Sequence, residues 1–135
     1  MSAAMMGATA FQKGLGAIHA ISHPIGALYN THHGTTNAVV MPSVLAFNQP
    51  AIEEPIRRLA NYLDITGGFD GFLNFLVELN VSLNIPKNLS ELGVIDPDLD
   101  ALAAAALADP SGSGNPVEMT LENTRQLLEK LMGDI

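Results

Sequence analysis

The sequence has no cysteine and no tryptophan, and only 5% of its 135 residues are aromatic. Without cysteine, the chain has no disulfide and no thiolate metal ligand, so a transition metal would have to be held by histidine and carboxylate groups. Basic residues are also few, and the net charge is −8. This charge disfavours nucleic acid and an anionic membrane surface as partners.

Long apolar runs are absent too, and no segment approaches the length of a membrane span. The N-terminal stretch "MSAAMMGATAFQKG" lacks the basic start before an apolar core that marks a signal peptide. We therefore expect no membrane association and a cytoplasmic location. Apolar residues nevertheless make up 47% of the chain, which argues for a folded domain rather than disorder.

No segment shows the alternating pattern of a strand, and nearly all of the chain has helical spacing. We predict helices over 2–15, 34–47, 50–64, 69–82, 97–109 and from 121 onward, with a short capped turn at 88–93. The sequence thus indicates one all-α domain over residues 1–135, with six to eight helices.

Several local features refine this prediction. The glycines of 2–15 would weaken an isolated helix, so we expect that segment to be buried. Pro24 should limit the helix that carries the first histidines, and Pro42 should kink or end the next one. We expect Thr35 or Thr36 to cap the helix over 34–47. We expect Asp96 to cap the helix over 97–109. In 69–82 we expect a buried apolar stripe made of Phe72, Leu73, Phe75, Leu76 and Leu79.

All four histidines lie in the stretch "GAIHAISHPIGALYNTHHG", residues 16–34. His19 and His23 are four residues apart and share a helix face, and a tight return could bring His33 beside His19. Spacing alone therefore allows a metal chelate by His19 and His23 or a cluster of three imidazoles. No Asp or Glu occurs from Met1 to Gln49. A complete site would need a distant acid (Asp64, Asp70 or Asp109) or a group from another chain.

The same stretch resembles the C-terminal signature of the iron-dependent (group III) alcohol dehydrogenases: a Gly, a His three residues on, a second His four later, and a His-Gly pair that starts a helix. These are Gly16, His19, His23 and His33-Gly34. The flanking segments "GTTNAVVMPSVLAFN", "LNIPKNLSELGV" and "LAAAALADPSGSGNP" are similar to the family as well. Two positions depart from it, since His32 stands where many relatives have Pro and Val117 where they usually have Arg.

The resemblance implies a fold and a site. The fold is the all-helical, metal-binding C-terminal domain of a dehydroquinate synthase-like protein, without its N-terminal α/β dinucleotide-binding domain. It makes His19 and His33 ligands of Fe²⁺ or Zn²⁺ and puts the Asp and the remaining His ligand before Met1. His23 is then the candidate catalytic and cofactor-binding residue, near the nicotinamide of NAD or NADP. His32 becomes a bystander.

The implied activity is alcohol and aldehyde interconversion by hydride transfer on a small substrate, with this chain alone catalytically incomplete. We expect it to form a homo-oligomer or to associate with the N-terminal half. Two alternatives remain open. One is a standalone helical module that self-associates or binds a partner, and the other is a remnant that keeps the fold while its metal site is empty.

Overall fold

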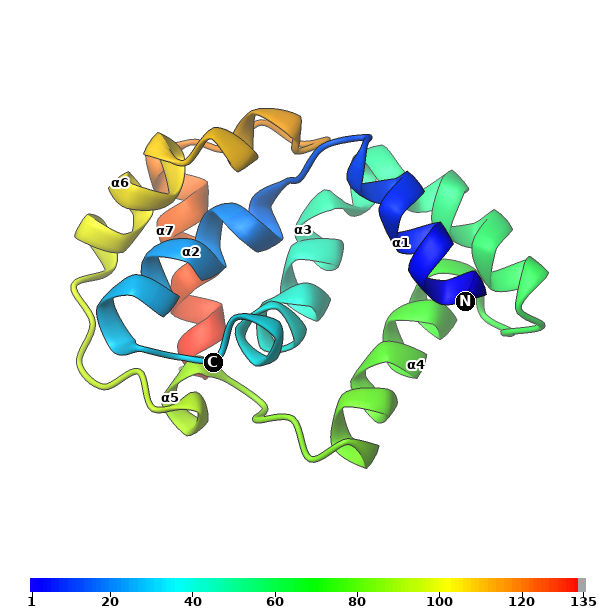
Figure 1. The fold of residues 1–135 in the computed structure, drawn as a ribbon, viewed down its shortest axis with the longest axis horizontal. Coiled ribbons are helices and arrows are strands. Elements are labelled where there is room, and N and C mark those ends of the chain that lie inside the picture. Colours follow the sequence, from blue (N-terminus) through cyan, green and yellow to red (C-terminus); the bar gives the residue numbers. More distant parts are fainter. Residues whose placement is uncertain (134–135) are drawn as a thin grey trace.

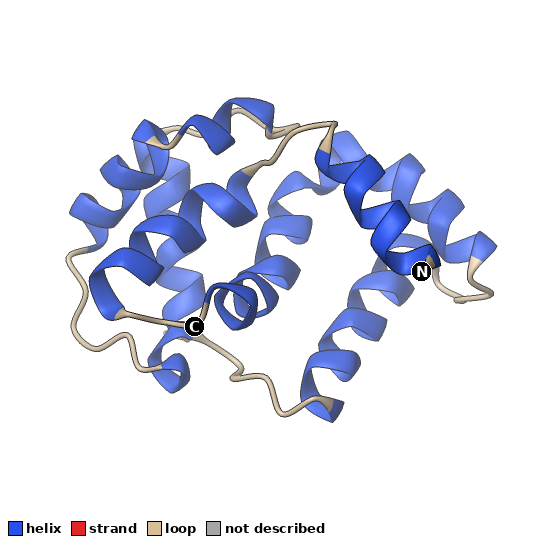
Figure 2. Cartoon of the chain, viewed as in Figure 1, coloured by secondary structure: helices blue, strands red, loops and turns tan. Residues whose placement is uncertain are grey.

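The computed structural model describes residues 1–133, and this part of the chain contains helices and no strand. The helices are α1 (Ser2–Phe11), α2 (Ala17–Tyr29), α3 (His33–Tyr62), α4 (Gly68–Ser82), α5 (Leu89–Leu92), α6 (Leu99–Ala108), the 3₁₀ helix η1 (Pro110–Gly114) and α7 (Leu121–Met132). The predicted all-α class and the helix count are confirmed (Figures 1 and 2).

The core lies where α2, α3, α6 and α7 meet, on the left of Figure 1. Each of these helices contributes side chains that are almost fully buried, among them Ile21, Val40, Leu102 and Leu128. Burial of aliphatic side chains of this size stabilises a fold by about 1.5–3 kcal/mol each. The helix that carries His19 and His23 is therefore fixed by the core on one face and free to present side chains on the other.

The prolines interrupt these helices less than predicted. α2 continues through Pro24 to Tyr29, and α3 runs from His33 to Tyr62 through Pro42, Pro50 and Pro55. The prediction that Pro24 limits its helix is wrong, as is the division at 47–50. A proline removes one backbone hydrogen bond. Buried residues on both sides hold the helix in the core at Pro24 (Ile21 and Ile25) and at Pro42 (Val40 and Val44). Figure 1 shows that α3 bends along its course from α2 toward α4.

Two burial predictions are wrong. α1 has no buried residue, and no other helix in residues 1–133 packs against it. In α4 only Phe69 is buried, whereas Phe75 and Leu79 of the predicted stripe are exposed. Both helices carry apolar side chains at helical spacing, but among the described residues α4 packs against α3 alone. Periodicity identifies an apolar face without identifying the element that covers it.

The observed caps correct two further details. Asp98, not Asp96, caps α6 through the backbone N–H of Ala101, so that helix begins two residues later than predicted. The cap of α3 is His32 rather than Thr35 or Thr36. Within residues 1–133, no helix combines the length and the apolar character needed to cross a bilayer.

Candidate metal centre

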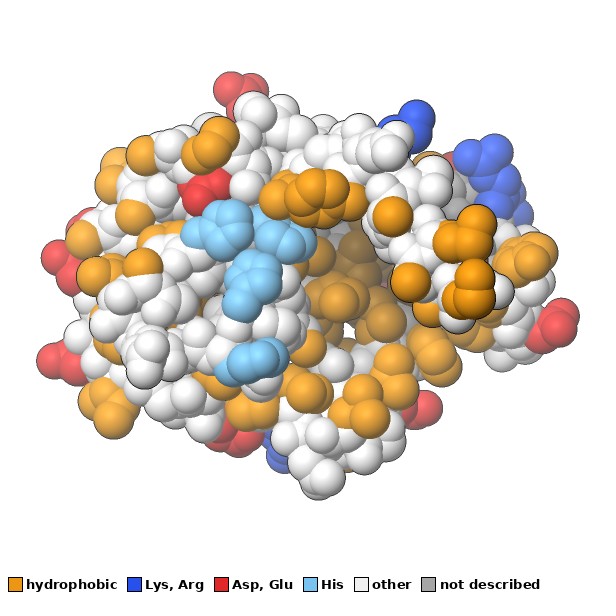
Figure 3. Space-filling view, viewed as in Figure 1, with side chains coloured by type: hydrophobic (Ala, Val, Ile, Leu, Met, Phe, Trp, Pro, Cys, Tyr) orange, Lys and Arg blue, Asp and Glu red, His pale blue; other side chains and the backbone are white. Residues whose placement is uncertain are grey.

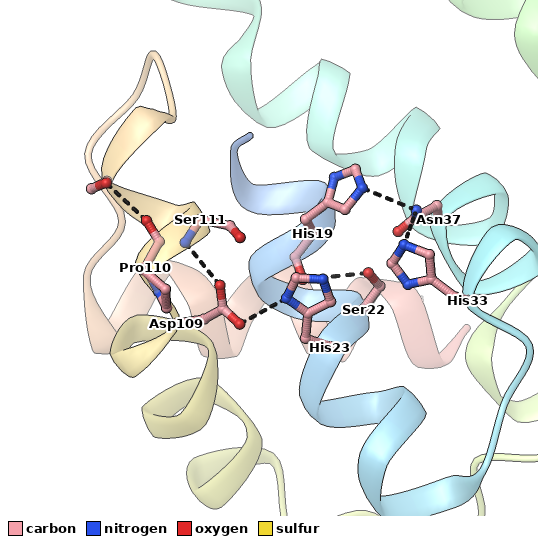
Figure 4. A network of polar contacts seen from close by, with 9 residues as sticks. His19, Ser22, His23, His33, Asn37, Asp109, Pro110 and Ser111 are labelled. Carbon is pink, nitrogen blue, oxygen red and sulfur yellow. Dashed lines mark hydrogen bonds and ion pairs between the residues drawn. The ribbon is translucent and has the colours of Figure 1, made fainter. Parts of the chain in front are cut away.

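Three of the four histidines meet at the surface of α2 and α3. His19 and His23 lie one turn apart on α2, and the chain reverses at Asn30, whose backbone is left-handed (φ 53°). His33 then opens α3 beside them. The ring centroids are 5.3 Å apart for His19 and His33, 5.4 Å for His23 and His33, and 5.7 Å for His19 and His23. The clustering of three imidazoles that the sequence suggested is present in the fold (Figure 4).

Asn37 lies between two of these rings. Its Nδ2 is 3.4 Å from Nε2 of His19 and 3.1 Å from Nε2 of His33. An amide nitrogen only donates, so both Nε2 atoms act as acceptors with their lone pairs toward the same point. Its Oδ1 is buried without a hydrogen-bond partner in residues 1–133. Asn37 was not predicted from the sequence, although its position four residues after His33 places it on the same helix face.

This geometry matches part of a metal shell. A neutral imidazole binds a metal through an unprotonated nitrogen, which His19 and His33 both direct toward Asn37. Protein sites use three or four such ligands. Within residues 1–133, no three His, Asp or Glu side chains come together as ligands of one ion. The donor set therefore fits one side of a metal centre that needs further ligands from elsewhere.

The third imidazole is engaged by an acid. Nδ1 of His23 lies 2.8 Å from Oδ2 of Asp109, at the junction of α6 and η1. Of the three acids considered from the sequence, only Asp109 makes a hydrogen bond or ion pair with a histidine in the described chain. Asp64 lies just after α3, and Asp70 lies in the first turn of α4. Although desolvation acts in the opposite sense, the backbone N–H of Ser111 and the His23 ring lower the pKa of Asp109. This carboxyl is therefore an ionised acceptor at neutral pH.

The neutral form is favoured at His19. Partial burial lowers the pKa of His19 below its ordinary value, and the nearby His33 and His23 lower it further, against a smaller opposing effect of Asp109. A group whose charged form is disfavoured keeps its lone pair over a wider pH range. The environment of His19 thus favours the form that a metal ligand requires.

His32, the fourth histidine, caps the start of α3. Its Nδ1 accepts the backbone N–H of Thr35 at 3.3 Å and lies 3.1 Å from the Thr35 hydroxyl, which makes it the N-cap of α3. The resemblance to the family makes it a bystander, and the structure supplies a local role for it in the helix start that positions His33.

A groove of about 420 Å³ reaches the cluster from one side. Its lining includes His19 together with the apolar side chains Ile18, Leu45 and Ile52. Figure 3 shows the histidines gathered on one face, at the edge of a hollow whose walls carry apolar side chains. Apolar walls beside a few polar groups are the usual composition of a small-ligand site.

These observations define an all-helical domain with an imidazole cluster at one edge. Residues 1–132 match the C-terminal part of the Fe-containing alcohol dehydrogenase family, and the chain belongs to this family. The resemblance identified from the histidine signature and the expected fold are thereby confirmed.

Relatives of known activity are similar over most of this chain. It is 40% identical to 4-hydroxybutyrate dehydrogenase of Cupriavidus necator, over 98% of this chain and 37% of that protein. It is 39% identical to lactaldehyde reductase of Escherichia coli (strain K12), over 84% of this chain and 32% of that protein. These relatives are oxidoreductases, and the chain spans about a third of their length.

Solved structures agree. A crystal structure of 1,3-propanediol oxidoreductase superposes with a TM-score of 0.80 at 29% identity, over 87% of this chain and 32% of that one. An alcohol dehydrogenase from Oenococcus oeni superposes with a TM-score of 0.78 at 26% identity, with the same coverage. The described helices therefore have the arrangement found in about a third of each of these larger proteins.

Proposed function

We propose that this chain is the metal-binding helical half of a metal-dependent, NAD(P)-linked alcohol dehydrogenase and that it is inactive alone. The observation that carries the proposal is the pair His19 and His33, with ring centroids 5.3 Å apart and both Nε2 atoms directed at Asn37. Family membership supports it, since the similar proteins are named as a dehydrogenase of 4-hydroxybutyrate and a reductase of lactaldehyde.

In this proposal His19 and His33 hold Fe²⁺ or Zn²⁺ through Nε2. The family resemblance assigns the other two ligands, an Asp and a His, to a part of the protein outside these 135 residues. The chemistry supplied at such a centre is Lewis-acid polarisation of the substrate oxygen, with hydride exchange carried by the nicotinamide of NAD or NADP.

The chain's own residues have separate tasks. His23 lies beside both proposed ligands and is hydrogen-bonded to Asp109, so it is the residue suited to move a proton or to orient the nicotinamide. Ile18, Leu45 and Ile52 line the groove beside His19 and would exclude water from a small alcohol or aldehyde. Substrate choice would depend on this wall together with that of an α/β domain.

The test is a chimera in which this chain replaces the matching C-terminal third of the Cupriavidus necator relative, which is 40% identical. The purified chimera, reconstituted anaerobically with Fe²⁺ or Zn²⁺, is assayed for NAD- and NADP-dependent oxidation of 4-hydroxybutyrate and short alcohols. We expect metal-dependent activity in the chimera and none in the isolated chain.

Two variants calibrate the result. His33→Ala removes a proposed ligand and should lower activity at least about 100-fold, since loss of a residue that only supports a ligand already costs about 10–100-fold. His32→Asn is the matched control, because asparagine is also a good N-cap and should leave activity within about threefold. A folded, metal-loaded chimera without activity would contradict the proposal.

A second candidate is a non-catalytic helical module that self-associates or binds a partner. It is favoured by the apolar side chains that α1 and α4 leave exposed, such as Met6 (71% exposed) and Val81 (58%). Contiguous exposed apolar surface marks interaction sites. Sedimentation velocity at several concentrations tests this, since the module should dimerise or assemble further, and a strict monomer up to high concentration argues against it.

A further inference from the structure

The acid beside His23 is itself held in place. Oδ1 of Asp109 accepts the backbone N–H of Ser111 at 2.8 Å, and its Oδ2 is the atom that contacts His23. The Asp109 side chain is 16% exposed, while that of His23 is 40% exposed. One oxygen thus caps η1 and the other is directed at the imidazole, so both atoms of the carboxylate are fixed by named partners (Figure 4).

A cap alone would explain only half of this contact. An N-cap needs one acceptor oxygen. Asp98 caps α6 in this way through Oδ1, and it makes no hydrogen bond to a histidine in the described residues. An ion pair for stability is an equally weak explanation, because pairs with a substantially exposed partner contribute little. The remaining consequence of the contact is its effect on the imidazole proton.

The contact specifies which ring nitrogen carries that proton. An ionised carboxylate only accepts hydrogen bonds, so Nδ1 of His23 must be the donor. A neutral imidazole has one N–H, and Nε2 is then unprotonated. Free histidine favours the opposite tautomer, with the proton on Nε2. The ring lies between Asp109 on one side and the rings of His19 and His33 on the other (Figure 4).

We propose that Asp109 is a positioning residue that holds His23 as the Nδ1–H tautomer and leaves Nε2 as a proton acceptor within the histidine cluster. The inference deepens the proposed function, and its catalytic consequence, proton transfer through His23, rests on that function. The tautomer itself is a property of this chain and does not depend on that function.

The substitution Asp109→Asn keeps nearly the same side-chain shape but should favour the opposite tautomer of His23. Ser111 N–H still needs an acceptor, so the amide oxygen should take the position of Oδ1. The amide nitrogen then faces His23 and can only donate, which requires an unprotonated Nδ1 and moves the ring proton to Nε2. Replacement of a carboxylate by an amide beside histidine is known to impose the wrong tautomer in a serine protease.

The experiment is long-range ¹H–¹⁵N correlation NMR of the uniformly ¹⁵N-labelled 135-residue chain, at a pH where the imidazoles are neutral. The His23 signals are assigned by their loss in His23→Gln. We expect Nδ1–H as the major tautomer in the wild type and Nε2–H in Asp109→Asn. The matched control is Asp98→Asn, which changes another capping aspartate and should leave the His23 shifts unmoved.

A wild-type His23 that is mainly Nε2–H overturns the inference without reference to any variant. An unchanged tautomer in a folded Asp109→Asn chain does so as well. In the chimera the same substitution should lower kcat at least tenfold while the metal content and the KM for the nucleotide stay within about twofold. If the tautomers are as stated and the chimera is inactive, the proposed function fails and the assignment of Asp109 stands.

Discussion

At the scale of single residues, the candidate site depends on a few polar contacts around the start of α2. Asn48 and Asn115 exchange two hydrogen bonds of 2.9 and 2.7 Å between their amides. Asn115 also accepts the backbone N–H of Ala17 at 3.1 Å and donates to the carbonyl of Val117. Asn115 thus links Asn48 of α3 to Ala17 at the start of α2, two residues before His19. All three residues line the groove.

Loss of this amide pair should destabilise the fold. Asn48→Ala removes two of the four hydrogen bonds made by the partly buried amide of Asn115, which costs about 1–3 kcal/mol. The free energy of unfolding, measured by urea denaturation, should fall by that amount. Asn61→Ala, at an exposed position of the same helix, is the control and should change it by less than about 0.5 kcal/mol. Equal effects at the two positions would show that the pair has no special weight.

His19 should make stability depend on pH. The pKa of His19 is lowered in the fold from its ordinary 6.5. Between the pKa in the fold and 6.5, the unfolded chain therefore binds more protons than the folded chain. Stability must therefore rise with pH through that window and fall as pH drops below about 6.5. Urea midpoints of the metal-free chain at about pH 5.5 and about pH 7.5 measure this difference. His19→Gln should reduce it, and an undiminished difference would contradict the assigned environment.

At the scale of elements, the sequence predicted the helices better than their neighbours. The last helix, α7, begins at Leu121 as predicted, and the predicted turn at 88–93 contains the short helix α5. The burial of α1 and α4 was predicted wrongly, because an apolar stripe such as Phe72 to Leu79 is the same whether a helix of this chain, another domain or solvent faces it.

The site shows the same division. The approach of His33 to His19 could be predicted, since both lie in one helix–turn–helix segment of the sequence. The contact of His23 with Asp109 spans 86 residues, and three acids were equally available to spacing arguments. Only the packing of α6 and η1 on α2 selects Asp109. Asn37 was missed because an asparagine in a helix carries no signal of its own.

The exposure of α1 leads to a deletion experiment. Because no described helix packs against α1, removal of residues 1–13 should change the free energy of unfolding by less than about 0.5 kcal/mol. By contrast, Leu102→Ala empties a fully buried position and should cost about 2–5 kcal/mol. Urea denaturation compares the two. A large loss on deletion would show that α1 packs on the body of the isolated chain in solution.

At the scale of the whole molecule, the domain has a packed core on one side and exposed apolar surface on the other. The core of α2, α3, α6 and α7 holds the histidine cluster in place, while α1 and α4 present apolar surface beyond the hollow. The relatives are about three times as long as this chain. Two clustered imidazoles on one wall, proposed here as metal ligands, with apolar surface next to them, have the form expected of one half of an interdomain site.

The assignment of His19 and His33 as metal ligands is tested most directly by the metal content of the chimera with the Cupriavidus necator relative, purified anaerobically after Fe²⁺ or Zn²⁺ reconstitution. We predict about one ion per chain in the wild type and in His32→Asn, and a substoichiometric content in His19→Ala and His33→Ala. Full metal content in both alanine variants, or none in a folded wild type, would contradict the assignment of His19 and His33 and would leave this chain as a helical domain whose metal site is empty.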